Sequence, residues 1–174
     1  MKEVERKMLA ELVRNARRSD RELAKSIGTS QPTATRIRTK LEREGFIKEY
    51  SAIPDVTKIG YSMLALTFLK LDLKLSQSAL QDFKNTHFEA LAKNPFAIFL
   101  VKTGMGLGYD AVVLSLHENY ASCDQFRNVC RDSMSSNITD MDTFLINLIE
   151  EKTSLPFTFS PFANQVLKLP DKIE

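Results

Sequence analysis

The chain has 174 residues, of which 43% are hydrophobic and 26% charged, a composition typical of globular rather than disordered proteins. The net charge is only +2, but residues 1–60 carry 14 basic and 9 acidic side chains (+5), whereas the rest carries 10 and 13 (−3). This length fits one medium domain or two small ones. A basic segment of this kind indicates a nucleic acid or a membrane surface as its partner.

Membrane insertion and secretion are not expected. No apolar run approaches the ~20 residues that a spanning helix needs, and the first residues lead into a charged helix instead of the apolar core of a secretory signal. Cys123 and Cys130 share one face of a predicted helix, but they are two turns apart and too distant to form a disulfide. Free thiols fit a reducing compartment. We therefore expect a soluble, cytoplasmic protein with no membrane partner.

The first sixty residues predict three helices. Apolar side chains at helical spacing predict the first, over about residues 3–15: Val4, Met8, Leu9, Leu12 and Val13. The second begins at a capping box, Ser19 with Glu22, and ends at Gly28. The third begins at its N-cap Ser30, tolerates a proline in its first turn and runs to about Arg43. Two helices joined by a tight glycine-containing turn form a helix-turn-helix.

The third helix carries two different faces. Ala34, Ile37 and Leu41 are predicted to point inward, while the outward side chains are hydrogen-bonding or cationic, with no carboxylate before Glu42. Hydrogen-bonding groups read base edges, and Arg and Lys neutralise phosphates. The predicted contacts to double-stranded DNA are Ser30, Gln31, Thr33, Thr35, Arg36, Arg38, Thr39, Lys40 and Arg43. The alternative is an ordinary solvated helix face.

After Gly45, alternating side chains over 46–54 predict a two-stranded wing that completes a winged-helix domain over residues 1–54. The motifs of this region, in order, are Leu23-Ala24, Ile27-Gly28, Ser30, Arg36, Leu41-Glu42, Gly45-Phe46-Ile47, Tyr50-Ser51-Ala52, Asp55 and Ile59-Gly60. Together with the helix order, they resemble the leucine-responsive regulator/AsnC (Lrp/AsnC) family of prokaryotic transcription factors. The chain departs from the family pattern at Ile37 and Arg38, which leaves the rotation of the third helix open. The resemblance therefore does not decide whether Arg36 or Arg38 contacts DNA.

Residues 55–61 have the composition of a hinge. The elements predicted beyond it are strand 62–73, helix 76–92, strands 96–102 and 109–117, helix 120–134 and strand 143–149. This order is the split βαβ arrangement. The predicted fold class is therefore α+β, with an N-terminal winged helix-turn-helix and a C-terminal ferredoxin-like βαββαβ domain over residues 62–152. The sheet face without helices needs a partner, and a second copy is the simplest one. We expect a homodimer, with a tetramer or octamer as larger alternatives.

The second domain also resembles the effector-binding and dimer-forming domain of the same family. The family pattern has a glycine between strands two and three and then an aspartate, here within a longer loop that carries three glycines. The resemblance implies an effector, often an amino acid, near this loop and near the loop 140–142. The residues that would border it are Gly104, Gly106, Gly108, Tyr109, Asp110, Asp140 and Asp142. Glycine backbone approaches an α-carboxylate closely, and a carboxylate pairs with an α-ammonium. Alternatively, the glycines only build a hairpin turn.

No metal, cofactor or catalytic site is predicted, because His87 and His117 lack companions at metal-ligand spacing and Cys123 has no base-and-orienter arrangement. The predicted function is a sequence-specific transcriptional regulator that binds half-sites one helical turn (~34 Å) apart or a multiple of it. The alternative is an enzyme like the siroheme decarboxylases, which share this two-domain layout, but residues 99–104 contain no His, Arg or Trp. Residues 153–174 form an arm that is expected to pack on the partner subunit or to cover an edge strand.

Overall fold

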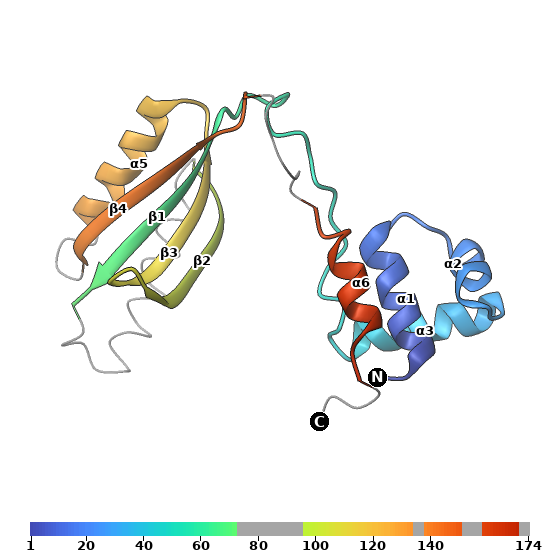
Figure 1. The fold of residues 1–174 in the computed structure, drawn as a ribbon. Helices are drawn as coiled ribbons and strands as arrows, with labels where there is room; N and C mark the ends of the chain where they lie inside the picture. The colour runs from blue at the N-terminus through green and yellow to red at the C-terminus, as the bar shows by residue number, and fades with distance from the viewer. Residues whose placement is uncertain (73–95, 134–137, 151–157, 171–174) are drawn as a thin grey trace. The chain divides into compact units, whose positions relative to one another are not determined.

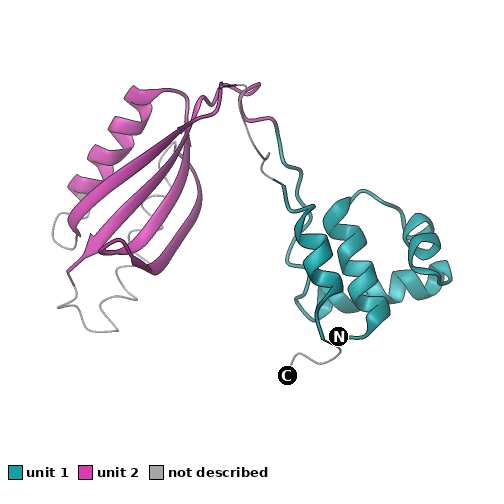
Figure 2. Cartoon of the chain, viewed as in Figure 1, with its two compact units in different colours: residues 1–54, 154–174 teal, residues 55–153 magenta. Residues whose placement is uncertain are grey.

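The computed structural model describes residues 1–72, 96–133, 138–150 and 158–170. The chain divides into two compact units, Met1–Pro54 with Ser154–Glu174 and Asp55–Thr153 (Figure 2). The first unit contains α1 (Glu3–Arg14), α2 (Asp20–Ile27), α3 (Gln31–Arg43) and α6 (Phe162–Leu167). The second contains β1 (Met63–Leu71), β2 (Ala97–Gly106), β3 (Tyr109–His117), α5 (Tyr120–Ser133) and β4 (Ile138–Asn147) (Figure 1). The helix predicted over 76–92 lies outside the described residues.

The helices of the first unit begin and end where local signals predict. The Ser19 side chain accepts a hydrogen bond from the Glu22 backbone N–H, and the Glu22 carboxylate accepts one from Ser19 N at 2.8 Å. Gly28 ends α2 with φ +72°, a conformation that glycine adopts without steric cost. The hydroxyl of Ser30 caps α3 by accepting from Thr33 N. These signals place α2 and α3 as a helix-turn-helix around a shared core of Met8, Leu12, Leu23, Ala24, Ile27, Ala34, Ile37 and Leu41.

The segment after α3 differs from the expected pair of strands. Residues 46–54 form no strand, so the two-stranded ladder predicted for the wing is absent. The segment is instead attached to α3: Ile47 N donates to the carbonyl of Leu41, and Tyr50 Oη donates to Glu42 Oε1 at 2.7 Å. Burial and this hydrogen bond raise the pKa of Tyr50 to about 12. A strand needs a neighbour to complete its hydrogen bonds, and alternation alone does not supply one.

The C-terminal arm also lies elsewhere than expected. Its helix α6 packs on α1 of the same chain, within the first unit (Figure 1). Ala163 and Val166 are buried there against Ala10. The prediction of an arm on the partner subunit or over an edge strand was therefore wrong for the described residues 158–170. The contact joins residues about 150 positions apart, which no local pattern reveals.

The second unit is built on a four-stranded antiparallel sheet in the order β2-β3-β1-β4. This is the strand order of a ferredoxin-like fold, as predicted. Helix α5 covers one face, where Phe126 and Cys130 pack with Leu69 and Val113 (Figure 1). Two strands are longer than predicted: β2 continues to Gly106, and β4 begins at Ile138.

The other sheet face carries rows of apolar side chains that cross all four strands. In one row, Leu100 lies beside Leu114, Leu114 beside Leu66, and Leu66 beside Phe144. Leu100 and Phe144 are exposed, and Leu114 and Leu66 are only half-buried. A second row runs through Ala97, Leu116, Leu64 and Ile146. Because the side-chain period of a strand is two residues, this face is opposite the one that α5 covers.

His117 belongs to the core beneath α5 and not to a site. It is fully buried, its Nε2 lies 2.8 Å from the hydroxyl of Ser115, and its ring contacts Phe96 and Phe126. Burial lowers its pKa, so the imidazole is neutral at physiological pH. Cys123 and Cys130 are buried, unbridged thiols of α5. His87 lies outside the described residues. Among the described helices, none has the length and apolar content needed to cross a membrane.

Candidate nucleic-acid interface

Helix α3 exposes a narrow stripe of side chains that is opposite its buried face. Ala34, Ile37 and Leu41 are buried and fix the rotation of the helix. At 3.6 residues per turn, the opposite stripe contains Arg36, Thr39 and Arg43, spaced i, i+3 and i+7. All three are exposed, as is Gln31 at the start of the helix. Among the described residues, none donates to or accepts from the side chains of these four.

Arg38 occupies a flank of α3 and is held by acidic neighbours. Its Nη1 lies 2.9 Å from Asp20 Oδ1 on α2, and its Nη2 donates to Asp20 Oδ2 at 3.1 Å. Its Nε is 3.8 Å from Glu42 one turn along. Thr35 donates to the same Asp20 carboxylate at 2.6 Å. The sequence leaves open which of Arg36 and Arg38 contacts DNA. In the structure, Arg38 is bound within the unit, whereas Arg36 is exposed and available to a ligand.

Lys40 occupies the opposite flank and is bound in the same manner. Its Nζ donates to Glu5 Oε1 at 2.7 Å and lies 3.7 Å from Glu44. These carboxylates raise the pKa of Lys40. Burial alone would raise the pKa of Glu5, but the hydrogen bonds from Lys40 and from Lys2 N outweigh it and lower that pKa. Lys40 thus joins α3 to the start of α1.

The remaining predicted residues lie at the helix start. Ser30 is used as the N-cap, and its hydroxyl is 2.9 Å from that of Thr33. Thus five of the nine predicted side chains have partners within the unit: Ser30, Thr33, Thr35, Arg38 and Lys40. The other four, Gln31, Arg36, Thr39 and Arg43, remain available to a ligand.

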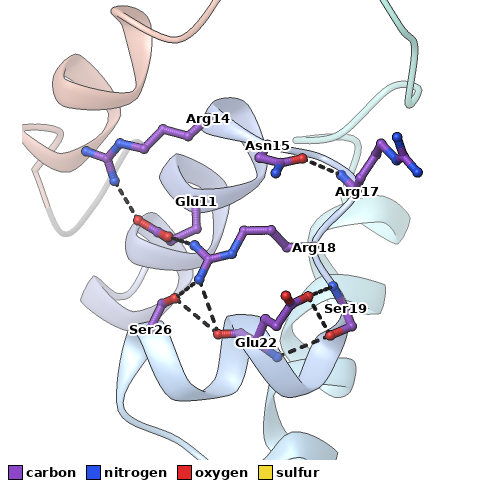
Figure 3. A network of polar contacts seen from close by, with 8 residues as sticks. All are labelled: Glu11, Arg14, Asn15, Arg17, Arg18, Ser19, Glu22 and Ser26. Carbon is purple, nitrogen blue, oxygen red and sulfur yellow. Dashed lines mark hydrogen bonds and ion pairs between the residues drawn. The ribbon is translucent and has the colours of Figure 1, made fainter.

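Two further basic side chains, outside the predicted set, are exposed on the neighbouring helix α2. Arg21 and Lys25 lie one turn apart on α2, both exposed. Their i, i+4 spacing places them on one side of α2. That spacing is the signal in the sequence by which they could have been added to the candidate DNA contacts. Figure 3 shows how the preceding Arg18 is bound instead: it contacts Glu11, Ser26 and the backbone carbonyl of Glu22.

The residues predicted to border an effector lie at one end of the sheet. Gly104 and Gly106 belong to β2, and the connection to β3 is only Leu107-Gly108, with φ +55° and +83°. Two central residues with positive φ are typical of a tight type I′ hairpin. The longer loop predicted here is therefore a two-residue turn, because Gly106 pairs with Tyr109 and extends the ladder.

Tyr109 and Asp142 meet across β1. The Tyr109 hydroxyl donates to Asp142 Oδ2, and its ring lies 5.9 Å from that of Phe68 on β1. The hydrogen bond to Asp142 raises the pKa of Tyr109 to about 12. Residues 140–142 were predicted as a loop but belong to β4, where they pair with Phe68, Leu69 and Lys70.

The two remaining aspartates of this set accept hydrogen bonds from backbone N–H groups. Asp110 accepts from Leu71 N at 3.0 Å, and Asp140 accepts from the adjacent Met141 N. A side-chain hydrogen bond therefore joins Tyr109 and Asp142, and Asp140 is close enough to Tyr109 to help raise its pKa.

Comparison with known proteins identifies the first unit. Residues 1–48 match the winged helix-turn-helix DNA-binding family. Over 60 residues, 34% of this chain, the sequence is 42% identical to an uncharacterised HTH-type transcriptional regulator of Pyrococcus abyssi. The match spans 40% of that relative's length. Residues 1–48 are therefore a DNA-binding domain of the winged helix-turn-helix type, as predicted, although the two-stranded ladder expected for the wing is not formed.

Solved structures share the fold of nearly the whole chain. An AsnC family transcriptional regulator from Agrobacterium tumefaciens is 22% identical with a TM-score of 0.72, over 90% of this chain and 97% of that one. A transcriptional regulator from Neisseria meningitidis, solved in complex with L-Met, is 19% identical with a TM-score of 0.68, over 90% and 96%. E. coli AsnC is 16% identical with a TM-score of 0.65, over 90% and 97%. The chain thus has the two-part α+β fold of AsnC-family regulators, which confirms the predicted fold class.

Proposed function

We propose that this protein is a sequence-specific DNA-binding transcriptional regulator that works in the cytoplasm as a homodimer and responds to a small molecule. The observation that carries the proposal is the stripe on α3. Its two flanking cations are bound by Asp20 and Glu5, whereas Arg36, Thr39 and Arg43 are exposed and have no described partner. Unpaired arginines aligned on one helix face contribute little to the stability of the fold, so their position is better explained by a ligand. On DNA, they would face base edges and phosphates.

In the proposed complex, α3 enters the major groove. Arg36 and Gln31 reach base edges, because a guanidinium fits guanine and a carboxamide fits adenine. Arg43, Arg21 and Lys25 neutralise phosphates, which sets the register of the protein without reading sequence. Arg38 and Lys40 act indirectly by holding α3 against α2 and α1.

Dimerisation would use the uncovered sheet face. The row of Leu100, Leu114, Leu66 and Phe144 spans the full width of the sheet. A second copy offers a matching row, and a two-fold axis pairs each patch with itself. Such a dimer presents two α3 helices to the two halves of a palindromic site, with half-sites about one helical turn (~34 Å) apart or a multiple of it.

The second unit would bind the effector near Tyr109 and Asp142. The N. meningitidis regulator of the same fold was solved in complex with L-Met, which supports an amino acid as the ligand class here. A carboxylate such as Asp142 pairs with an α-ammonium, and the backbone near Gly106 and Gly108 is open enough for close approach. No enzymatic activity is part of the proposal.

Selection of bound sequences from a random DNA library tests the function. We expect the full chain to enrich a palindromic motif and to bind it far more tightly than a scrambled duplex of equal length. Equal affinity for both, with a steep salt dependence, would mean non-specific binding only and would contradict the proposal.

A further inference from the structure

Helix α1 buries side chains on two sides. Met8 and Leu12 face the core that it shares with α2 and α3. Ala10, two residues from each, is also fully buried, but against Ala163 and Val166 of α6. At 100° per residue, the two stripes lie on different sides of the helix. Helix α6, the last helix among the described residues, therefore covers one side of α1 in the first unit (Figure 1).

Polar contacts continue from α6 into the helix-turn-helix. The Asn164 side chain accepts from Arg14 Nη2 at 2.9 Å, and Arg14 Nη1 donates to Glu11 at 2.6 Å. Glu11 also binds Arg18, which reaches Ser26 and the Glu22 carbonyl on α2 (Figure 3). The apolar contact and this chain of bonds together fix α6 to α1 and, through Arg18, to α2.

The position of α6 gives the chain a second connection between its units. The first connection leads from the segment after α3 to β1. The second leads from β4, which ends at Asn147, to α6, which begins at Phe162. Both leave the second unit at one point, because Leu148 N donates to the carbonyl of Ser62 at 2.9 Å. Ser62 itself is fixed, since its N donates to His117 O and its hydroxyl to Glu118 O.

We propose that α6 is a second anchor, which restricts how each DNA-binding unit moves relative to the sheet unit. A single connection leaves a wide range of positions, because a chain spans up to ~3.3–3.6 Å per residue. Two connections that leave one point and end at two places in a domain permit only the positions that both can reach. The anchor is lost whenever α6 leaves α1.

The anchor has a consequence for DNA that rests on the proposed function. Two DNA-binding units with restricted positions tolerate few spacings between half-sites, whereas units on single flexible connections tolerate many. The C-terminal arm would thus set the spacing specificity of the dimer without contacting DNA. Its residues Asn164 and Val166 are positioning residues in this sense.

Distance distributions between two spin labels test the anchor without DNA. The labels are attached to cysteines introduced by Ala16→Cys in the first unit and Asp132→Cys in the second, both exposed positions; Cys123 and Cys130 are buried. Diluting the labelled chain with unlabelled chain isolates distances within one chain. Val166→Asp places a charge in the α1–α6 contact, and Gln165→Asp places the same charge on the exposed side of α6 as the matched control.

We expect Val166→Asp to broaden the distribution about twofold relative to the parent and Gln165→Asp to leave it unchanged. A second variant inserts six Gly/Ser residues after Glu150, which lengthens the connection while keeping the contact of α6, and it should broaden the distribution as well. If Val166→Asp loses helical structure, the insertion variant is the one that tests the anchor. Equal widths in all four proteins would overturn the anchor.

The DNA consequence is tested with the selected palindrome, varying its half-site spacing one base pair at a time. We expect a narrow optimum for the parent and Gln165→Asp, and a flatter profile for the insertion variant. An equally narrow profile for the insertion variant would overturn the spacing role. Absence of any sequence preference in the parent would instead contradict the proposed function, while the spin-label result on the anchor would still stand.

Discussion

The Asp20 carboxylate on α2 holds the Arg38 guanidinium on α3 through two N–O pairs, at 2.9 and 3.1 Å. The side chain of Asp20 is 13% exposed and that of Arg38 is 31% exposed, so the pair is shielded more than a surface ion pair. It bridges the two helices of the helix-turn-helix and includes Thr35. Arg36, two residues before Arg38, is exposed without such a partner. We therefore predict separate roles for the two arginines, with Arg38 acting in stability and Arg36 in DNA binding.

The first prediction separates those roles. Arg36→Ala should weaken binding to the selected palindrome by ~1–3 kcal/mol, if Arg36 reads a guanine, and leave the unfolding free energy unchanged. Arg38→Ala should lower the unfolding free energy of the first unit by about 1 kcal/mol, because Asp20 loses its cationic partner and keeps only Thr35. Thermal unfolding and a binding titration measure the two effects. Arg131→Ala, on exposed α5 surface, is the control; the reverse pattern for Arg36 and Arg38 would refute the assignment.

Local signals in the sequence predict the helix-turn-helix well. Ser19, Gly28 and Ser30 act within one turn of their own position, by capping hydrogen bonds or a positive φ, and such effects do not depend on distant residues. The buried face of α3 follows equally from spacing. The pairing of Arg38 and Lys40 could not be predicted, because their partners Asp20 and Glu5 belong to other helices.

Long-range pairing explains the remaining differences. The start of β4 is polar, and it is a strand because Ile138 and Asp140 pair with Leu71 and Lys70 on β1. Burial of Ala10 depends on α6, more than 150 residues later. The choice of Tyr109 and Asp142 as neighbours depends on strand order, which places β1 between their strands. None of these contacts leaves a periodic signal in the sequence.

The second prediction concerns pH and the buried acid of α1. The pKa of Glu5 lies below its ordinary value, 4.5, so its ionised form stabilises the fold. That contribution is fully present above pH 4.5 and is lost as pH falls through the lowered pKa. Glu5→Gln should therefore destabilise the first unit by about 1 kcal/mol near neutral pH and lose this difference in more acidic solution.

Urea unfolding across this pH range, followed by helical circular dichroism, measures the difference for Glu5→Gln. Glu3→Gln is the matched control, because the Glu3 side chain is 69% exposed and its ion pair with Lys7 lies at the surface. An equal pH dependence of the two variants would show that the Glu5–Lys40 pair contributes no linked stability.

The third prediction concerns the uncovered sheet face. Phe144 lies at the end of a row of apolar side chains and is 62% exposed in the single chain. Phe144→Glu would place a charge in the proposed interface and should weaken the dimer at least about 100-fold, since burying an unpaired charge is unfavourable. Sedimentation velocity over a dilution series measures this. Tyr120→Glu changes an aromatic side chain of similar exposure on α5 and should remain dimeric; a dimeric Phe144→Glu protein would exclude this face.

The fourth prediction concerns the ionisation of Tyr109. Its pKa is raised to about 12, first by its hydrogen bond to Asp142, then by burial and by the negative charges of Asp140 and Asp142. Asp142→Asn removes the charged acceptor, so the pKa of Tyr109 should fall toward its ordinary value, 10.0. Tyrosinate absorbance in an alkaline titration measures it, and subtraction of the Tyr109→Phe protein isolates this residue. An unchanged titration would mean that Tyr109 does not donate to Asp142 in solution.

The last prediction tests effector binding at the same pair. If the Asp142 carboxylate receives the α-ammonium of an amino acid, Asp142→Asn should weaken binding at least about tenfold, because a charge-assisted hydrogen bond becomes a neutral one. Calorimetric titration with a panel of amino acids that includes L-methionine identifies the ligand first. Asp132→Asn, an exposed carboxylate of α5, is the control for the lost charge. Equal weakening in both variants would indicate a general effect of net charge, and unchanged binding in Asp142→Asn would move the effector site away from this end of the sheet.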